Sequence, residues 1–288
     1  MAKLNAPSHK KINRSVYGNA VIFVILFILG MFTALPLWYT LVSAFKPFDE
    51  IFIFPPRLYV RRPTLDNFIL MFQLATNMWV PFSRYLFNSL FICVVGTVGH
   101  ILIASLAAYP LAKHSFAAKK AINEIIVLAL LFTPQVTYIP LYIVMSRLHL
   151  IDTYWALILP AWQMTLGLYL MKQFMTQIPD SLLEAGKIDG ANELMIWWKV
   201  VMPNVKPAWL TLTILSFQQL WNQTGGSFIF SENLKVLPTL LQQIAAGGIA
   251  RAGVGAAVAL FLMIPPIILF IISQSSVMET MVSAGIKG

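Results

Sequence analysis

The stretch from Ser15 to Phe45 reads SVYGNAVIFVILFILGMFTALPLWYTLVSAF and contains no charged residue. A helix that crosses a bilayer needs about 20 consecutive apolar residues, and this stretch is long enough. The apolar core of a secretory signal peptide is shorter, about 7–15 residues, and a cleavage site follows it. We therefore predict an uncleaved membrane helix, preceded by a cytoplasmic tail over residues 1–14.

The composition of the whole chain is that of a membrane protein. Of 288 residues, 58% are hydrophobic and only 11% are charged, whereas soluble domains carry about 25% charged residues. The formal net charge of +9 comes from basic residues scattered between apolar stretches, so it does not indicate nucleic-acid binding. The single cysteine, Cys93, excludes an internal disulfide and disfavours a thiolate metal site. We expect neither a metal site nor a nucleic-acid partner.

Apolar stretches along the chain predict an all-α membrane protein with six transmembrane helices. Each stretch has to be helical, because hydrocarbon offers no partner for free backbone N–H and C=O groups. We treat residues 15–288 as one transmembrane domain. The predicted spans cover about residues 17–45, 85–112, 122–146, 153–172, 207–229 and 253–278.

Basic residues near the ends of the spans predict the orientation of the chain. Cytoplasmic segments carry an excess of Lys and Arg, and short segments carry this signal best. The N-terminal tail and the loop between the second and third spans are both short and basic. We therefore expect a cytoplasmic N-terminus, and six spans return the C-terminus to the same side. The basic residues concerned are Lys3, Lys10, Lys11, Arg14, Lys113, Lys119 and Lys120, and Lys287 lies on the same side.

The segment over residues 178–206 lies between the fourth and fifth spans and has features of two short helices. Ser181 and Glu184 have the spacing of a capping box, so we expect a helix to begin there. Asp189-Gly190 is a turn signal, and Asn192 is able to cap a second helix. Leu194, Trp197, Trp198 and Val201 would form the apolar face of that helix, which Pro203 and Pro207 would end.

This pair of helices fits two interpretations. In the first, the small residues Ala185 and Gly186 allow the surface of another protein to approach, and Glu184 offers it a charge. In the second, the pair is an amphipathic hairpin that lies on the lipid surface. The pattern by itself favours neither.

The same residues resemble the EAA loop of binding-protein-dependent ABC import permeases. Glu184-Ala185-Gly186 is followed by Gly190 and by Met202-Pro203, in the order of the family pattern. The chain departs from that pattern at Gly186, where alanine is usual, and at Met202, where leucine is usual. The glycine turn and the acidic residue are both kept.

Further motifs resemble the G-subunit group of maltose permeases, which imports di- and oligosaccharides. The resemblance covers nearly the whole chain, although Gln274-Ser275-Ser276 departs from the usual run after the last span. The motifs are Phe45-Lys46-Pro47, Phe87-Asn88-Ser89, Ala107 to Ala112, Leu148 to Thr153, Trp221-Asn222, Pro265-Pro266 and Ser283 to Gly288.

The resemblance implies a transport subunit that is not itself an enzyme. It would move a sugar across a bacterial or archaeal cytoplasmic membrane with ATP hydrolysed elsewhere. ATP and Mg would be held by the partner ATPase, and this chain would bind no cofactor. The implied partners are a second permease subunit in a heterodimer, two cytoplasmic ATPase subunits and an extracytoplasmic solute-binding protein, within membrane lipid. The coupling residues would be Glu184, Ala185, Gly186, Asp189 and Gly190.

Candidate substrate-pathway residues lie late in the fifth span. Gln218, Gln219 and Asn222 place three amides in a membrane segment, and Trp221 adds an aromatic face. Sugar sites use both kinds of side chain, although amides also serve helix packing. His100 lies inside the second span, where we expect a neutral histidine bonded between helices.

Two alternative functions stay open. The same architecture imports other polar solutes such as a glycerol phosphate, although the interiors of the spans lack the basic groups that a phosphate favours. An ion-coupled secondary transporter needs carboxylates at membrane depth and often has inverted repeats. The spans show neither, since Glu124 and Glu279 lie at span ends.

Overall fold

The computed structural model describes residues 16–77 and 79–285, so the predicted tail 1–14 and Lys287 lie outside the described residues. The described part is helical and contains no strand. Short 3-10 helices occur at Gly226–Phe228, Glu232–Leu234 and Ile249–Arg251, and a π-helix at Trp197–Val201. The α-helices are α1 Val16–Ala44, α2 Phe48–Ile51, α3 Asp66–Thr76, α4 Phe82–Lys113, α5 Lys119–Ala129, α6 Pro134–Arg147, α7 Trp155–Trp162, α8 Thr165–Thr176, α9 Asp180–Ile188, α10 Glu193–Ile196, α11 Met202–Asn204, α12 Lys206–Trp221, α13 Leu237–Ala245 and α14 Ala252–Gly285.

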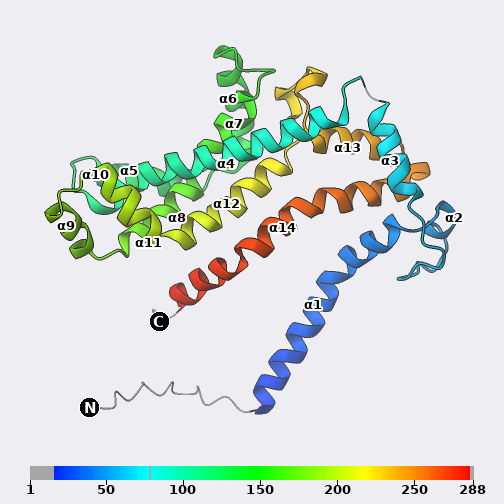
Figure 1. The fold of residues 1–288 in the computed structure, drawn as a ribbon, viewed down its shortest axis with the longest axis horizontal. Coiled ribbons are helices and arrows are strands. Elements are labelled where there is room, and N and C mark those ends of the chain that lie inside the picture. The colour runs from blue at the N-terminus through cyan, green and yellow to red at the C-terminus, as the bar shows by residue number, and fades with distance from the viewer. Residues whose placement is uncertain (1–15, 78, 286–288) are drawn as a thin grey trace.

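The centre of the bundle is α4, which packs against α7, α8 and α12. Helix α14 lies along α12, and α1 joins the bundle mainly through contacts with α14 (Figure 1). Figure 1 also shows α9, α10 and α11 at one end of the bundle and α2, α3 and α13 at the opposite end. The segment 178–206 is therefore separated from the opposite loops by the length of the bundle.

Three helical stretches are long and apolar enough to cross a membrane by length and composition. They cover Tyr17–Ala44, Phe82–Lys113 and Ile249–Gln274, and they coincide with the predicted first, second and sixth spans. The first stretch has none of its apolar window buried inside the chain, so lipid or another protein must cover it. The count of six spans stays a prediction.

The predicted third and fourth spans are each divided into two helices. Helices α5 and α6 meet at a bend of 110°, because Thr133 is extended before Pro134. Helices α7 and α8 are separated by Gln163 and Met164, and Met164 is extended with φ −60° and ψ 102°. Residues 122–146 and 153–172 therefore do not each form a single helix.

The fifth helix is shorter than the predicted range of 207–229. Helix α12 ends at Trp221, and Asn222 is its C-cap. Gly225 then takes a φ of +79°, a left-handed conformation that a helix does not contain. The glycine pair Gly225-Gly226 thus directs the chain into the loop that leads to α13.

That loop, over residues 222–237, is fastened to α4 and to the segment before α7 by hydrogen bonds. The Asn88 amide donates to the carbonyls of Asn233 and Lys235 at 2.9 Å each and accepts from the Tyr154 hydroxyl at 2.7 Å. Asp152 accepts hydrogen bonds from the Phe230 and Ser231 backbone N–H groups at 2.9 and 2.8 Å, and from the Ser231 hydroxyl. The loop is a fixed part of the fold.

We predict that Asn88→Leu destabilises the fold. Asn88 is 0% exposed, and an apolar replacement leaves two carbonyls and a hydroxyl without their partner. Each unsatisfied buried group costs about 1–3 kcal/mol, so the midpoint of thermal unfolding in detergent should fall by several degrees. The control is Asn77→Leu at an exposed position, which should unfold with wild type. Equal midpoints for the two variants would contradict the role given to Asn88.

Candidate functional site

The segment 178–206 begins with helix α9, whose N-cap lies two residues earlier than the expected Ser181. Its N-cap is Pro179, with φ −61° and ψ 136°, and no side chain caps the helix. The predicted capping box of Ser181 and Glu184 is therefore wrong. Proline has a preset φ, and Asp180 in the first turn interacts favourably with the helix dipole, so the helix begins without a hydroxyl cap.

The predicted turn and second cap are confirmed. Gly190 has a φ of +79°, and its N–H donates to the Lys187 carbonyl at 3.0 Å. The Ala191 N–H donates to the Gly186 carbonyl at 3.0 Å, which closes the end of α9. The Asn192 side chain accepts from the Met195 N–H at 2.8 Å and caps α10. Two helical segments thus meet at a glycine turn.

The two helical segments bury a common apolar side. Leu183 of α9 packs in one cluster with Ile196, Trp197 and Val201. The second helix lies directly against Gly186, since an added Cβ would lie 3.4 Å from Ile196 Cγ1, an ordinary contact distance. The surface that approaches Gly186 closely therefore belongs to this chain.

Part of the predicted apolar face points outward instead. Leu194 and Trp198 are 67% and 57% exposed, whereas Trp197 and Val201 are buried. The helix is a π-helix from Trp197 to Val201, and this wider turn shifts the buried side relative to the 3.6-residue period of our prediction.

Polar contacts at two points fasten the segment to the end of α4. The Tyr109 hydroxyl donates to Glu193 Oε2 at 2.8 Å, and the Lys187 ammonium lies 2.8 Å from Glu193 Oε1. The Lys113 ammonium donates to Asp180 Oδ1 at 2.7 Å and to the Ile178 carbonyl at 2.5 Å. Helix α4 therefore contacts the segment on both sides of the glycine turn.

These contacts lower the pKa of both acidic residues. The hydrogen bond from Lys187 is the main cause for the lowered pKa of Glu193, and the bond from Tyr109 adds to it. The hydrogen bond from Lys113 is the main cause for Asp180. Sequence analysis missed Tyr109, Lys113, Asp180 and Glu193 as a group, because their contacts join positions at least 67 residues apart.

The predicted coupling residues are brought together on the outer surface of this segment. Glu184, Ala185, Asp189 and Gly190 are exposed, and Gly186 is half-buried. The exposed apolar side chains Ile188 and Leu194 accompany them, at 86% and 67% exposure. A surface that combines free carboxylates, a rigid turn and apolar side chains is suited to contact with another protein.

The predicted substrate-pathway residues separate into two groups. Trp221 is buried, stacks on Phe217 and donates from Nε1 to the Leu262 carbonyl at 2.9 Å, so it joins α12 to α14. Gln218, Gln219 and Asn222 are exposed. Gln218 also lines a cleft of about 250 Å³ between α12 and α14, together with Ile214, Phe217, Pro266, Ile267, Leu269 and Phe270.

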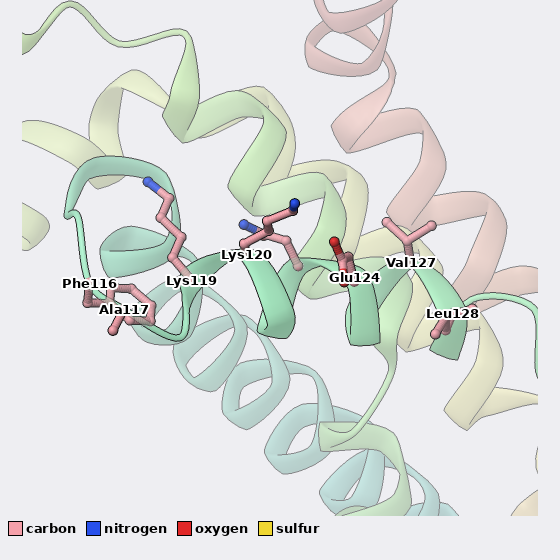
Figure 2. Close-up of a pocket in the computed structure, with 8 residues that line it drawn as sticks. Phe116, Ala117, Lys119, Lys120, Glu124, Val127 and Leu128 are labelled. Carbon is pink, nitrogen blue, oxygen red and sulfur yellow. The ribbon is translucent and has the colours of Figure 1, made fainter.

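A second, wider groove of about 810 Å³ follows one side of α5 (Figure 2). Figure 2 shows Lys119 and Lys120 near its start and Val127 and Leu128 near its end. Since residues 116–128 alone line it, it is an open helix face and not an enclosed solute site. In residues 16–77 and 79–285, no three His, Cys, Asp or Glu side chains gather as a metal ion requires.

Comparison with known proteins gives a family match. Residues 100–281 match the family described as "Binding-protein-dependent transport system inner membrane component". A probable ABC transporter permease of Pyrococcus horikoshii is 30% identical over 77% of this chain and 79% of its own. An arabinooligosaccharide permease, AraQ, of Halalkalibacterium halodurans is 28% identical over 88% and 91% of the two chains. The sn-glycerol-3-phosphate permease UgpE of Yersinia enterocolitica is 29% identical over 80% and 79%.

The fold itself has a solved counterpart. A chain from the crystal structure of a bacterial ABC transporter involved in import of the acidic polysaccharide alginate superposes with a TM-score of 0.76. The match covers 92% of this chain and 99% of that one, at 22% identity. A similar overall fold therefore occurs in an experimental structure.

We predict that Glu193→Gln and Tyr109→Phe both loosen the segment 178–206 from α4. The carboxylate of Glu193 has a lowered pKa, so its stabilising effect is complete above the usual range of glutamate, about pH 4. That effect is lost as the pH falls through the lowered folded pKa. Hydrogen exchange of residues 180–204 at pH 7 should be faster in both variants than in wild type.

The control for this measurement is Tyr17→Phe, a change at an exposed tyrosine of α1. It should leave exchange in residues 180–204 unchanged. Exchange that is equally slow in Glu193→Gln and wild type would show that the Tyr109–Glu193 contact does not hold the segment.

Proposed function

Because the chain belongs to the family of binding-protein-dependent transport system inner membrane components, we propose that it is the permease subunit of an ABC importer for a sugar. The observation that supports this most directly is the family match over residues 100–281, which includes the glycine turn at Gly190. The full-length similarity to an arabinooligosaccharide permease supports an oligosaccharide as the substrate class.

In this proposal the segment 178–206 faces the cytoplasm and docks in a groove of an ATPase subunit. Glu184 and Asp189 are exposed and free to meet basic residues of that subunit. Gly190 sets the turn, while Gly186 holds the second helix close to the first. ATP and Mg bind to the ATPase, and this chain only receives the movement.

The proposed topology has six crossings, with both termini in the cytoplasm of a bacterium or archaeon. Three helical stretches are long enough to cross by themselves. The pairs α5–α6 and α7–α8 and the shorter α12 would supply the other three. In Figure 1 the start of α1, the end of α14 and the segment 178–206 lie toward the same end of the bundle, as this orientation requires.

The proposed partners are a second permease subunit, two ATPase subunits and an extracytoplasmic solute-binding protein. The apolar surface of α1, exposed along its length, would be covered by the second permease subunit and by lipid. The loops around Phe54-Pro55-Pro56 and Gly247-Gly248 lie at the end opposite the segment 178–206, and Phe54 is 90% exposed. These loops would face the binding protein.

The cleft between α12 and α14 is the proposed contact with the sugar. Phe217 and Phe270 offer apolar ring faces beside the Gln218 amide, which is the combination that sugars use. No lysine or arginine lines the cleft, so it does not favour an anion such as a glycerol phosphate, although a relative carries one. Helices α1, α4 and α12 contain no carboxylate, which disfavours an ion-coupled transporter.

The test of coupling compares Gly190→Val with Gly186→Ala in the complete transporter. A β-branched residue at a positive φ costs about 1–2 kcal/mol, so ATP-dependent uptake should fall about tenfold in Gly190→Val. Gly186→Ala is the matched control, since its Cβ makes an ordinary 3.4 Å contact and alanine is usual there. Its uptake should equal that of wild type.

Both variants are compared at equal amounts of protein in the membrane. If Gly190→Val takes up sugar as fast as wild type, the proposed role of the Gly190 turn in docking is wrong. A purified chain that binds no ATPase subunit and takes up solute on an ion gradient alone would overturn the importer proposal itself.

A further inference from the structure

The break between α7 and α8 lies against a buried histidine of α4. His100 is 0% exposed, and neither ring nitrogen has a hydrogen-bond partner. The backbone carbonyls of Ala161 and Trp162, in the last turn of α7, lie close to this ring. The Ala161 carbonyl accepts a hydrogen bond from the Met164 N–H at 3.4 Å. The last carbonyls of a helix otherwise lack partners within it, and inside a membrane no water replaces them. A donor aimed at the Trp162 carbonyl would therefore satisfy this helix end.

In the contact between α4 and the broken pair α7–α8, each side contributes one glycine that faces an aromatic ring of the other side. A Cβ on Gly167, in α8, would lie 2.0 Å from His100 Nε2. A Cβ on Gly99, in α4, would lie 2.3 Å from Trp162 Nε1. Each side thus presents one ring and one glycine, and each ring occupies the space that the opposite glycine leaves. The two contacts lock the position of the break against α4.

The same junction holds other unpaired polar atoms. Thr97 Oγ1, Trp162 Nε1 and Ser216 Oγ are buried without partners. The neighbours of Ser216 on α12 show where it lies. Leu212 lies near the position of an added Cβ on Gly167, and Leu220 lies near the position of an added Cβ on Gly96. Ser216 lies between them on the same helix face. Polar side chains at this depth are costly, so their grouping around a helix break indicates a role.

We propose that His100 is a positioning residue for the transport cycle, which donates a hydrogen bond to the carbonyls at the end of α7 and fixes the angle at which α8 continues. Rotation about the soft χ2 torsion turns a ring N–H toward these carbonyls. Helix α8 carries this angle to the segment 178–206, because Met171 and Met175 share one apolar cluster with Leu183 and Trp197. The role in transport rests on the proposed function; the contact with the break does not.

The contact is tested without transport, by thermal unfolding of the purified chain in detergent. Gly167→Ala should lower the unfolding midpoint, because its methyl group overlaps the His100 ring. The double variant His100→Ala with Gly167→Ala should recover at least half of that loss, because the ring is gone. A Gly167→Ala variant as stable as wild type, or a double variant no more stable than Gly167→Ala, would overturn the proposed contact.

The positioning role is tested in the complete transporter by replacing the donor. His100→Gln keeps an N–H and should keep at least half of wild-type sugar uptake. His100→Leu fills similar space without a donor and should lose uptake about fivefold or more, while the sugar-stimulated ATPase rate changes less. More ATP would then be spent for each sugar, which a merely less stable protein does not show.

Equal uptake by His100→Leu and wild type would overturn the positioning role, and so would an equal loss in His100→Gln and His100→Leu. If His100→Leu does not reach the membrane, the double variant replaces it, since it also lacks the donor and should show the same loss of coupling. An inactive wild-type transporter with the expected unfolding midpoints would reject the proposed function and leave the contact standing.

Discussion

Backbone groups inside hydrocarbon have to find their hydrogen bonds within the protein, and this constraint decides where each part of the fold lies. The long apolar helices α1, α4 and α14 satisfy it mostly within themselves, and Trp221 Nε1 donates to the Leu262 carbonyl, which Pro266 deprives of its helical partner. A helix that is interrupted at membrane depth needs protein around the interruption. The break between α7 and α8 meets this need because it packs on α4, with glycines at the two points of closest approach. The need to satisfy backbone hydrogen bonds within the protein thus explains both the apolar bundle and the polar junction between α4 and the α7–α8 break.

Helix α4 contacts the functional regions at both ends of the molecule. Near its start, Asn88 holds the loop 222–237, and at its end Tyr109 and Lys113 hold the segment 178–206. Helix α4 is continuous over 32 residues, so the loop 222–237 and the segment 178–206 are fixed to one element. In the proposed transport cycle, movement of the segment would be resisted, or passed on, by this helix. Bending at the break between α7 and α8 would disrupt fewer backbone hydrogen bonds than bending within the continuous helix α4.

Sequence analysis predicted the features that depend on local chemistry. The charge-free stretches predicted α1, α4 and α14, and Asp189-Gly190 and Asn192 predicted the turn and the cap that the structure contains. Hydropathy did not show where the third and fourth spans are interrupted, because it depends on side-chain polarity and not on the extended backbone conformations of Thr133 and Met164. Contacts such as Gly99 with Trp162 were also out of reach, since they depend on how two distant helices pack. The place of Trp221 was also out of reach: its ring lies at the α12–α14 contact and donates to the Leu262 carbonyl.

The change from apolar to polar surface locates one membrane boundary without counting charges. Along α1 the exposed side chains are apolar, as lipid or an apolar partner requires. In the segment 178–206 the pattern is reversed: Leu183, Ile196 and Val201 are buried, while Glu184, Lys187 and Asp189 are exposed. That is the pattern of a domain in water. The reversal occurs where the Lys113 ammonium meets Asp180, an ion pair whose desolvation cost is smaller where water or headgroups reach it. The exposed Ile188 and Leu194 are exceptions within this polar surface, and apolar side chains in such a setting favour a protein partner over lipid.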